Sequence, residues 1–326
     1  MAIQRLIKFT LVFTLAVILM GAYTRLSDAG LGCPDWPGCY GHLAVPSASH
    51  DLANIESRFP DAQIEPEKAW LEMIHRYIAG TLGLMVLAIL IMCLKQPQSP
   101  KKLPVFIAVL IVFQAALGMW TVTMKLMPVV VMAHLIGGFS LFALLLLLYL
   151  RLKPLRIPGG DTYARKLIPL ALASLGVLVI QIILGGWTSS NYAALACTTL
   201  PICEGNWIDN LRFADAFSPF QGDHPSFEFG VLDYATRMTI HVSHRIWAVV
   251  TAITLIVLAL KLRYAQSHIM RNSGYLLLLL VIAQVGLGIS NVVMNLPLGI
   301  AVSHNGGAAL LLLTLVFINY ALWRKA

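Results

Sequence analysis

Four histidines that lie in long apolar segments are the residues of this sequence best suited to chemistry. They are His75, His134, His244 and His304. The first and third are each followed directly by arginine, and the other two are each followed within four residues by Gly-Gly. An ionisable side chain is costly to place among apolar residues unless it has a partner. The repeated pattern therefore predicts that these imidazoles are ligands of a bound metal or cofactor.

The composition indicates an integral membrane protein. Of the 326 residues, 58% are hydrophobic and 12% are charged, whereas soluble domains carry about 45–50% apolar and about 25% charged residues. Apolar runs of roughly 18 residues or more are typical of membrane-spanning helices. We expect eight, at 7–24, 70–94, 103–124, 128–150, 166–188, 236–260, 273–294 and 297–322. A soluble enzyme, a nucleic-acid-binding protein and a disordered chain are excluded.

The first apolar run has a cleaved signal peptide as its alternative interpretation. The run is long, however, and no small-residue cleavage site stands out at its end. Signal peptides have a shorter apolar region followed by such a site. We therefore expect this segment to be a retained membrane helix.

Basic residues set the expected orientation. With a cytoplasmic N-terminus, 15 of the 23 Lys and Arg residues fall on the cytoplasmic side, as the positive-inside rule requires. Of the 15 acidic residues, only Asp161 falls inside. We expect both termini in the cytoplasm and two long outer loops, 25–69 and 189–235, the first with an acidic stretch at 50–67 that is solvated or forms a docking face. The net charge of +8 then reflects topology, and no nucleic-acid partner is predicted.

The two halves of the chain repeat the same motifs. Gly21 corresponds to Gly185, His75 to His244 and His134 to His304, with offsets of 164, 169 and 170 residues. Each half has four spans, an even number, so both enter the membrane in the same sense, as parallel repeats do. We predict an all-α integral membrane protein with eight transmembrane helices. They should form two tandem four-helix bundles, 1–155 and 156–326, related by a pseudo-two-fold axis along the membrane normal.

The two histidines of each half are expected to converge on one cofactor. All four helices that carry them begin at the outer face, and a rise of 1.5 Å per residue puts the rings about 8–12 Å below it. Two imidazoles can supply both axial nitrogens of a haem iron in a helical bundle. The carboxylate pairs of di-iron bundles are missing, and two histidines underfill a tetrahedral zinc site. Haem is favoured, with hydrogen-bonded structural histidines as the alternative.

Arginines and glycines near the histidines are candidates to complete such sites. Arg76 and Arg245 directly follow ligand histidines and can pair with haem propionates, and Arg25 and Arg237 are secondary candidates. The glycine pairs after the other two histidines would let a flat macrocycle approach the backbone. Small residues of this kind are equally common at tight helix contacts.

The halves differ at one position beside these ligands. Glu72 lies three residues before His75 on the same helical face, whereas its counterpart is His241. A carboxylate beside a cofactor can act as a base, orient water or stabilise developing positive charge. The alternative role is an ion pair with Arg76 or Arg25, and His241 is a candidate proton relay or alternative ligand. We expect the reactive site in the N-terminal half and a fixed electron-transfer haem in the other.

Two cysteine pairs lie in the expected outer loops. Cys33 and Cys39, like Cys197 and Cys203, are separated by five residues. The outer side is oxidising, so disulfides are plausible there, with reduced thiols as the alternative. A four-cysteine zinc site fits poorly, because such ligands are usually two to four residues apart. Cys93 is expected to be an inert thiol.

These motifs closely resemble those of the haem A synthase family, membrane enzymes that convert haem O to haem A for terminal oxidases. The resemblance covers the whole chain and rests on Gly21-Ala22-Tyr23-Thr24-Arg25-Leu26 with Gly30-Leu31, Glu72-Met73-Ile74-His75-Arg76, Ala133-His134, Ser243-His244-Arg245 and Ser303-His304. It implies oxidation of one porphyrin methyl group to formyl through successive hydroxylations. Haem O is the implied substrate, haem A the product and haem b the cofactor.

By position, the resemblance also assigns residue roles. His75 and His134 match the ligands of the substrate haem, His244 and His304 match those of haem b, and Glu72 matches the catalytic acid. Cysteine pairs occur in part of the family, where a redox role is suggested for the first pair. In this chain, fastening of the loop is a sufficient alternative.

The resemblance further implies partners and a location. The farnesyltransferase that makes haem O and the assembly of terminal oxidases are the implied partners, in the inner (cytoplasmic) membrane with the haem sites near its outer face. The electron acceptor and the oligomeric state stay open, and a homo-oligomer is compatible with the sequence. A di-haem electron-transfer protein of the cytochrome b type is the strongest rival, and a haem carrier or oxidase assembly factor is the second. The first rival would use the same four histidines but would not need Glu72 to differ from His241, and retained haem identity after turnover would separate both rivals from the enzyme.

Overall fold

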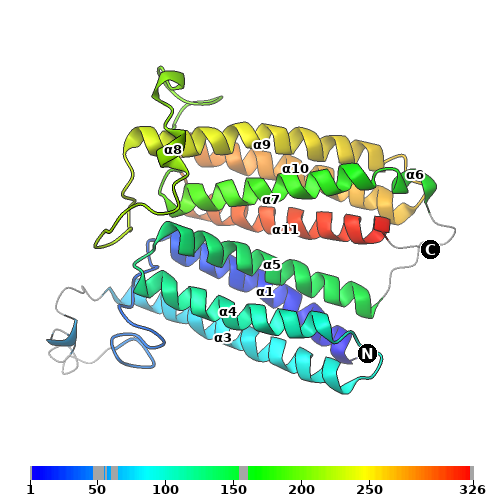
Figure 1. The fold of residues 1–326 in the computed structure, drawn as a ribbon, viewed down its shortest axis with the longest axis horizontal. Helices are drawn as coiled ribbons and strands as arrows, with labels where there is room; N and C mark the ends of the chain where they lie inside the picture. Colours follow the sequence, from blue (N-terminus) through cyan, green and yellow to red (C-terminus); the bar gives the residue numbers. More distant parts are fainter. Residues whose placement is uncertain (1, 47–54, 56, 60–64, 154–160, 324–326) are drawn as a thin grey trace.

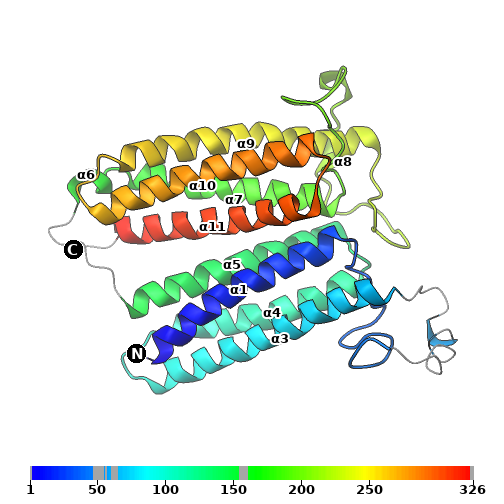
Figure 2. The same ribbon diagram turned by 180° about the vertical axis from the view of Figure 1, so that it is seen from behind.

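The computed structural model describes residues 2–46, 55, 57–59, 65–153 and 161–323. Within them, eight helices are long and apolar enough to cross a membrane, which confirms the predicted all-α membrane fold (Figures 1 and 2). They are α1 (Ala2–Leu26), α3 (Pro66–Lys95), α4 (Lys102–Thr123), α5 (Pro128–Leu152), α7 (Ile168–Ser190), α9 (Tyr234–Leu262), α10 (His268–Val293) and α11 (Leu298–Trp323). The predicted junction at 155/156 and most of the acidic stretch 50–67 lie outside the described residues.

Several helices begin before the apolar runs that predicted them. The structure starts α1 at Ala2, α3 at Pro66 and α10 at His268, where the runs suggested 7, 70 and 273. An apolar run marks only the part of a helix that suits lipid, while the helix itself continues through polar residues until its backbone is capped. Proline in the first turn, where no N–H donor is needed, starts α3, α5 and α7.

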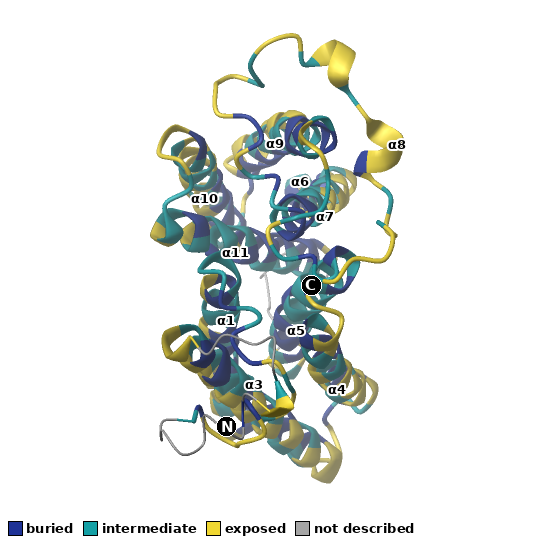
Figure 3. Cartoon of the chain, turned by 90° about the vertical axis from the view of Figure 1, so that its left-hand side faces the viewer, coloured by how far each residue is buried: buried dark blue, intermediate teal, exposed yellow. Residues whose placement is uncertain are grey.

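The long helices form two groups of four that lie side by side. In one group α1, α3, α4 and α5 pack together, and in the other α7, α9, α10 and α11 do so (Figures 1 and 3). The groups meet where α1 and α5 contact α11 and where α5 contacts α7. This arrangement agrees with two four-helix halves, while their pseudo-two-fold relation stays a prediction.

The outer surface of the groups suits contact with lipid. Phe106, Val109 and Val112 on α4 are 56%, 62% and 70% exposed. Lipid tails are as apolar as these side chains, so no hydrophobic penalty opposes their exposure in a bilayer. The exposed apolar residues thus belong to a membrane-embedded surface.

The long connections gather at one end of the molecule. Residues that follow α1 and those between α7 and α9 lie at this end, while the two termini lie at the other (Figures 1 and 2). The short helix α8 (Phe213–Ala216) is held to α7 there, because the Trp187 Nε1–H donates to the carbonyl of Ala216 at 2.7 Å. Asp233 caps α9 through the N–H of Thr236 (2.8 Å), and hydrogen bonds from the side chain and backbone of Thr236 lower the pKa of Asp233.

Asp161 joins two elements at the opposite end. Its carboxylate is buried and accepts from the N–H of Ala164, in the short helix α6 (Thr162–Arg165), at 2.8 Å. It also accepts from the N–H of Ser267, directly before α10, at 2.9 Å. The only acidic residue expected on the cytoplasmic side therefore has a structural role.

Replacing Asp161 by alanine should lower stability by about 1–3 kcal/mol, because it leaves buried N–H donors without an acceptor. Thermal unfolding of the purified protein in detergent measures this loss. Asp223→Ala, which changes an exposed acid in an outer loop, is the matched control. Equal melting temperatures for both variants would contradict the assigned role.

Candidate functional site

Each of the four predicted ligand histidines packs its imidazole against a glycine of a neighbouring helix. The pairs are Gly21 with His75, Gly118 with His134, Gly185 with His244 and Gly288 with His304. A Cβ atom on these glycines would lie 2.8, 3.4, 3.1 and 3.2 Å, respectively, from the Cε1 atom of the ring. The rings therefore rest on bare backbone, and a larger residue at the glycine would push against them.

In α5 and α11 one glycine of each Gly-Gly pair lies at a tight helix contact, while the expected contact of the pairs with a macrocycle stays a prediction. Gly137 faces Gln114, and Gly307 faces Gln284, each so closely that an added Cβ would collide with the amide. The Gln284 Nε2–H donates to the carbonyl of His304 at 2.9 Å. These glycines therefore serve tight helix contacts, the alternative that the sequence left open.

Sequence reasoning missed the glycines that face the rings and one polar neighbour. Gly21 and Gly185 hold the same place in the two halves, so the recurrence of glycine there was the available signal. The polar neighbour is Gln181 on α7, whose amide lies against His244. It has no polar counterpart in the first half, so the repeat gave no sign of it.

The two ring nitrogens of three of these histidines differ in how far they are covered. The Nδ1 atoms of His75, His134 and His304 are buried without a hydrogen-bond partner among the described residues, whereas their Nε2 atoms are not. His134 is a close ionisable neighbour of His75, and His304 is one of His244. At His244 the amide nitrogen of Gln181 lies 3.1 Å from Nδ1 and 3.5 Å from Nε2. Two imidazoles in each half fit the axial ligation of a haem iron.

Glu72 lies at the contact between α3 and the loop that follows α1. Its Oε2 accepts from the N–H of Cys33 at 2.9 Å, and its Oε1 forms an ion pair with Arg76 Nη2 at 2.5 Å. The other terminal nitrogen of Arg76 donates to the carbonyl of Gly38 in the same loop. Burial and the nearby Glu72 carboxylate raise the pKa of the loop phenol Tyr40 above its ordinary value. The ion pair expected as an alternative role of Glu72 is thus present.

His241 takes the place of Glu72 in the second half. Its Nδ1 lies 3.3 Å from the N–H of Cys197, and its Nε2 lies 3.1 Å from Arg245 Nε. Arg245 also donates to the carbonyls of Cys197 (2.5 Å) and Thr199 (2.6 Å). A neutral imidazole accepts at one nitrogen only, whereas a carboxylate accepts at both oxygens. The two halves thus bring the same two groups, a loop N–H and an arginine, to this position, but only the Glu72 carboxylate can accept from both at once.

The four arginines predicted beside haem propionates fall into two groups. Arg76 and Arg245 hold the outer loops, as described above. Arg25 donates to the carbonyl of Ser189 (3.1 Å) and lies 4.1 Å from the ring centre of Tyr192. Within the described part of the chain, the buried Nε atoms of Arg25 and Arg237 have no hydrogen-bond partner. Unused N–H groups favour the second pair for a carboxylate, and the propionate role of all four stays a prediction.

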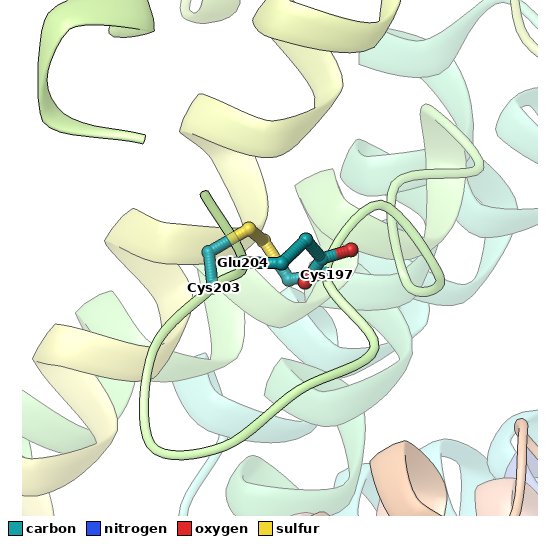
Figure 4. A group of neighbouring side chains, drawn as sticks. All are labelled: Cys197, Cys203 and Glu204. Atoms are coloured by element: carbon teal, nitrogen blue, oxygen red, sulfur yellow. A yellow bond between two sulfur atoms is a disulfide. The ribbon is translucent and has the colours of Figure 1, made fainter. Parts of the chain in front are cut away.

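Both expected disulfides are present. Cys33 is bonded to Cys39, and Cys197 to Cys203, while Cys93 is free and buried. The carboxylate of Glu204 comes close to the second disulfide (Figure 4). The sulfur atoms of this group are bonded to each other and offer no thiolate, so it does not support the zinc alternative.

Comparison with known proteins identifies similar chains over the full length. A family described as cytochrome oxidase assembly protein (COX15-CtaA) matches residues 4–316. A protein named heme A synthase from Shewanella oneidensis is 70% identical over 326 residues, which cover 100% of this chain and 98% of the relative. Proteins of the same name from Rhizorhabdus wittichii and Caulobacter vibrioides are 25% and 27% identical, covering 95% and 91% of this chain and 91% and 89% of their own.

Gly21→Ala should displace the ring of His75, because the new Cβ would lie only 2.8 Å from Cε1. Overpacking of this kind costs about 1–3 kcal/mol. We expect reduced haem content and an altered haem absorption spectrum in the purified protein. Gly80→Ala, where an added Cβ meets nothing within 4 Å, is the control on α3. Identical spectra for the two variants would show that the ring does not depend on this contact.

Proposed function

The chain belongs to the COX15-CtaA family of cytochrome oxidase assembly proteins, and from this premise we propose that it acts as a haem A synthase. In this proposal it is an oxidoreductase that converts a porphyrin methyl group of haem O to a formyl group. The observation that carries the proposal is the difference between Glu72 and His241. Both side chains bind the N–H of a loop cysteine three residues before a predicted ligand histidine, but only one of them is a carboxylate. One half has a carboxylate beside its ligand histidine, and the other does not.

The N-terminal half is the proposed substrate site and the C-terminal half the cofactor site. His75 and His134 would ligate the iron of haem O, and His244 and His304 would ligate haem b. Bound haem b supplies one-electron redox chemistry. The bare glycine beside each ring supports this assignment, as does the contrast between the buried Nδ1 and the uncovered Nε2 atoms of His75, His134 and His304, which favours Nε2 as the ligating atom of these three.

Glu72 is the proposed proton acceptor of the reaction. With water as the source of oxygen, replacing one C–H bond of the methyl group by a C–O bond releases two electrons and two protons. The electrons would leave by way of the cofactor site to an external acceptor, and the protons need a base beside the methyl group. Hydrogen bonds from Cys33, Arg76 and the backbone of Gly32 use three of the four lone pairs of the carboxylate, and one remains. The same contacts fix the carboxylate one helical turn from His75. Glu72 can therefore hold the loop and accept a proton.

The Cys33–Cys39 disulfide supports this arrangement without taking part in the chemistry. It closes the loop whose Cys33 N–H binds Glu72. The second disulfide closes the equivalent loop beside His241, in the half to which no methyl oxidation is assigned. Fastening therefore accounts for both pairs.

The cellular setting follows from the same proposal. We place the protein in the inner membrane with both termini in the cytoplasm, because the expected distribution of Lys and Arg favours the side of the termini as the inside, and the long connections lie at the opposite end. A farnesyltransferase would supply haem O, and terminal oxidases in assembly would receive haem A. The di-haem electron-transfer alternative uses the same four histidines but assigns no role to the Glu72 carboxylate.

Glu72→Gln should lower the rate of haem A formation by about 10²–10⁴-fold, the usual contribution of a general base. The amide oxygen can still accept from the Cys33 N–H, so loop and haem content should be retained. Chromatography with mass analysis of the extracted haems measures the product. His241→Gln, the matching change in the other half, should keep most of the activity. Normal haem A output from Glu72→Gln would refute the assignment.

His244→Ala should remove haem b from the C-terminal half, because one axial nitrogen is lost. The reduced-minus-oxidised absorption spectrum and the haem-to-protein ratio measure this loss. His268→Ala, at the start of α10 and paired with Arg271 at 2.7 Å, is the control. An unchanged haem spectrum in His244→Ala would count against the ligand scheme.

A further inference from the structure

A segment between α7 and α9, which we call the outer collar (residues 208–220), is fixed to both helices and includes α8. The N–H of Arg212 donates to Thr239 Oγ1 of α9 at 2.9 Å. The carbonyl of Ala216 accepts from Trp187 Nε1–H of α7 at 2.7 Å. In the view along the helices, α8 lies at the periphery, beside α7 and α9 (Figure 3). The collar is therefore attached to the flank of the second helix group.

The outer collar exposes large apolar side chains. Ile208, Phe213, Phe217 and Phe220 are 62%, 57%, 39% and 75% exposed. The rings of Phe213 and Phe217 stack with their centres 6.5 Å apart, as neighbours on one helical face can. Asp215, two residues from each of these rings, lies on the opposite face of the turn and is exposed. An apolar face opposite a charged one is typical of segments that lie in a membrane interface.

The depth of the collar follows from its contacts with α9. The hydrocarbon core of a bilayer is about 30 Å thick, which corresponds to about 20 helical residues. The last exposed apolar residue of α9 is Leu260, and Lys261 follows it directly. Counted from Leu260, the hydrocarbon core ends near Ile240, which shares a buried apolar cluster with Ala216 of the collar. The collar therefore lies at the edge of the hydrocarbon core.

Aromatic residues on other helices mark the same depth. Tyr23 and Trp120 lie three residues before the ends of α1 and α4, and both are 38% exposed. Exposed tyrosine and tryptophan are enriched at membrane–water interfaces. Trp187 lies three residues before the end of α7 and corresponds to Tyr23 by the offset of 164 residues, but it is only 5% exposed. In the second half, the collar therefore covers a position that the first half exposes at the interface.

We propose that the outer collar is an interfacial anchor, whose apolar side chains lie at the headgroup–acyl boundary of the outer leaflet in the orientation proposed above. The next exposed residues of α9 beyond Ile240 are Ile246 and Val249, which belong to the lipid-facing surface. The collar continues this surface to the edge of the membrane. Its contact with lipid holds the second outer loop, with its Cys197–Cys203 disulfide, beside α9 whether or not a haem is bound.

The test measures the depth of the collar in the full chain, reconstituted in lipid nanodiscs. Cys93→Ala is the parent, so that one introduced cysteine carries a nitroxide label, at Phe213→Cys or at Phe220→Cys. Electron paramagnetic resonance compares collisions of the label with oxygen, which concentrates in lipid, and with a water-soluble nickel chelate. Val249→Cys, at a position of α9 that is 59% exposed, is the lipid reference. Asp223→Cys, at an exposed position of the loop that follows the collar, is the water reference.

The ratio of oxygen to nickel collisions at Phe213 and Phe220 should be close to that at Val249 and well above that at Asp223. A label at Asp215→Cys should give a ratio nearer to the water reference, because it lies on the opposite face of α8. Phe220→Cys decides the matter alone if Phe213→Cys, which loses the ring stacking, does not fold.

Two outcomes would overturn the proposal. A ratio at Phe220 equal to that at Asp223 would show that the collar lies in water. Low collision rates with both reagents at Phe220 would show that protein, such as a second copy of this chain, covers the collar in place of lipid.

Discussion

Each half of the candidate site is held in place by one backbone hydrogen bond. It runs from a loop N–H to a side chain that lies one helical turn before a predicted ligand histidine. In the first half it joins the Cys33 N–H to Glu72, and in the second it joins the Cys197 N–H to His241. The disulfide closes the loop, and an arginine four residues further along the helix binds the loop carbonyls. Because Glu72 and His75 share one helical face, this contact also sets where the carboxylate lies relative to the ring.

The two halves solve this structural problem alike but are equipped for different tasks. Since His241 fastens its loop without a permanent charge, loop attachment does not require the carboxylate of Glu72. The halves also differ at Gln181, whose amide lies against His244 and whose counterpart by the repeat offset is the apolar Val17. A carboxylate beside the ligand histidine of one half only agrees with the proposal of one haem that reacts and another that stays.

The sequence predicted the helices and the disulfides well because both leave local marks, in apolar runs and in paired cysteines. It predicted helix starts less well, since Pro66 and His268 lie in polar segments that lipid preference does not reveal. It did not predict that Gly21 lies under His75, or that Arg76 binds the first loop. Both contacts join residues at least 38 positions apart, and only packing of the folded chain brings them together.

The most direct test of the account is to identify the haems in cells that make this protein together with a source of haem O. Haems are extracted from the purified protein and from the membranes, separated by chromatography and identified by mass. The account predicts haem A or its hydroxymethyl precursor, absent from the empty-vector control, together with haem b in the protein. Folded, haem-loaded protein that yields only haem b and unaltered haem O would contradict it.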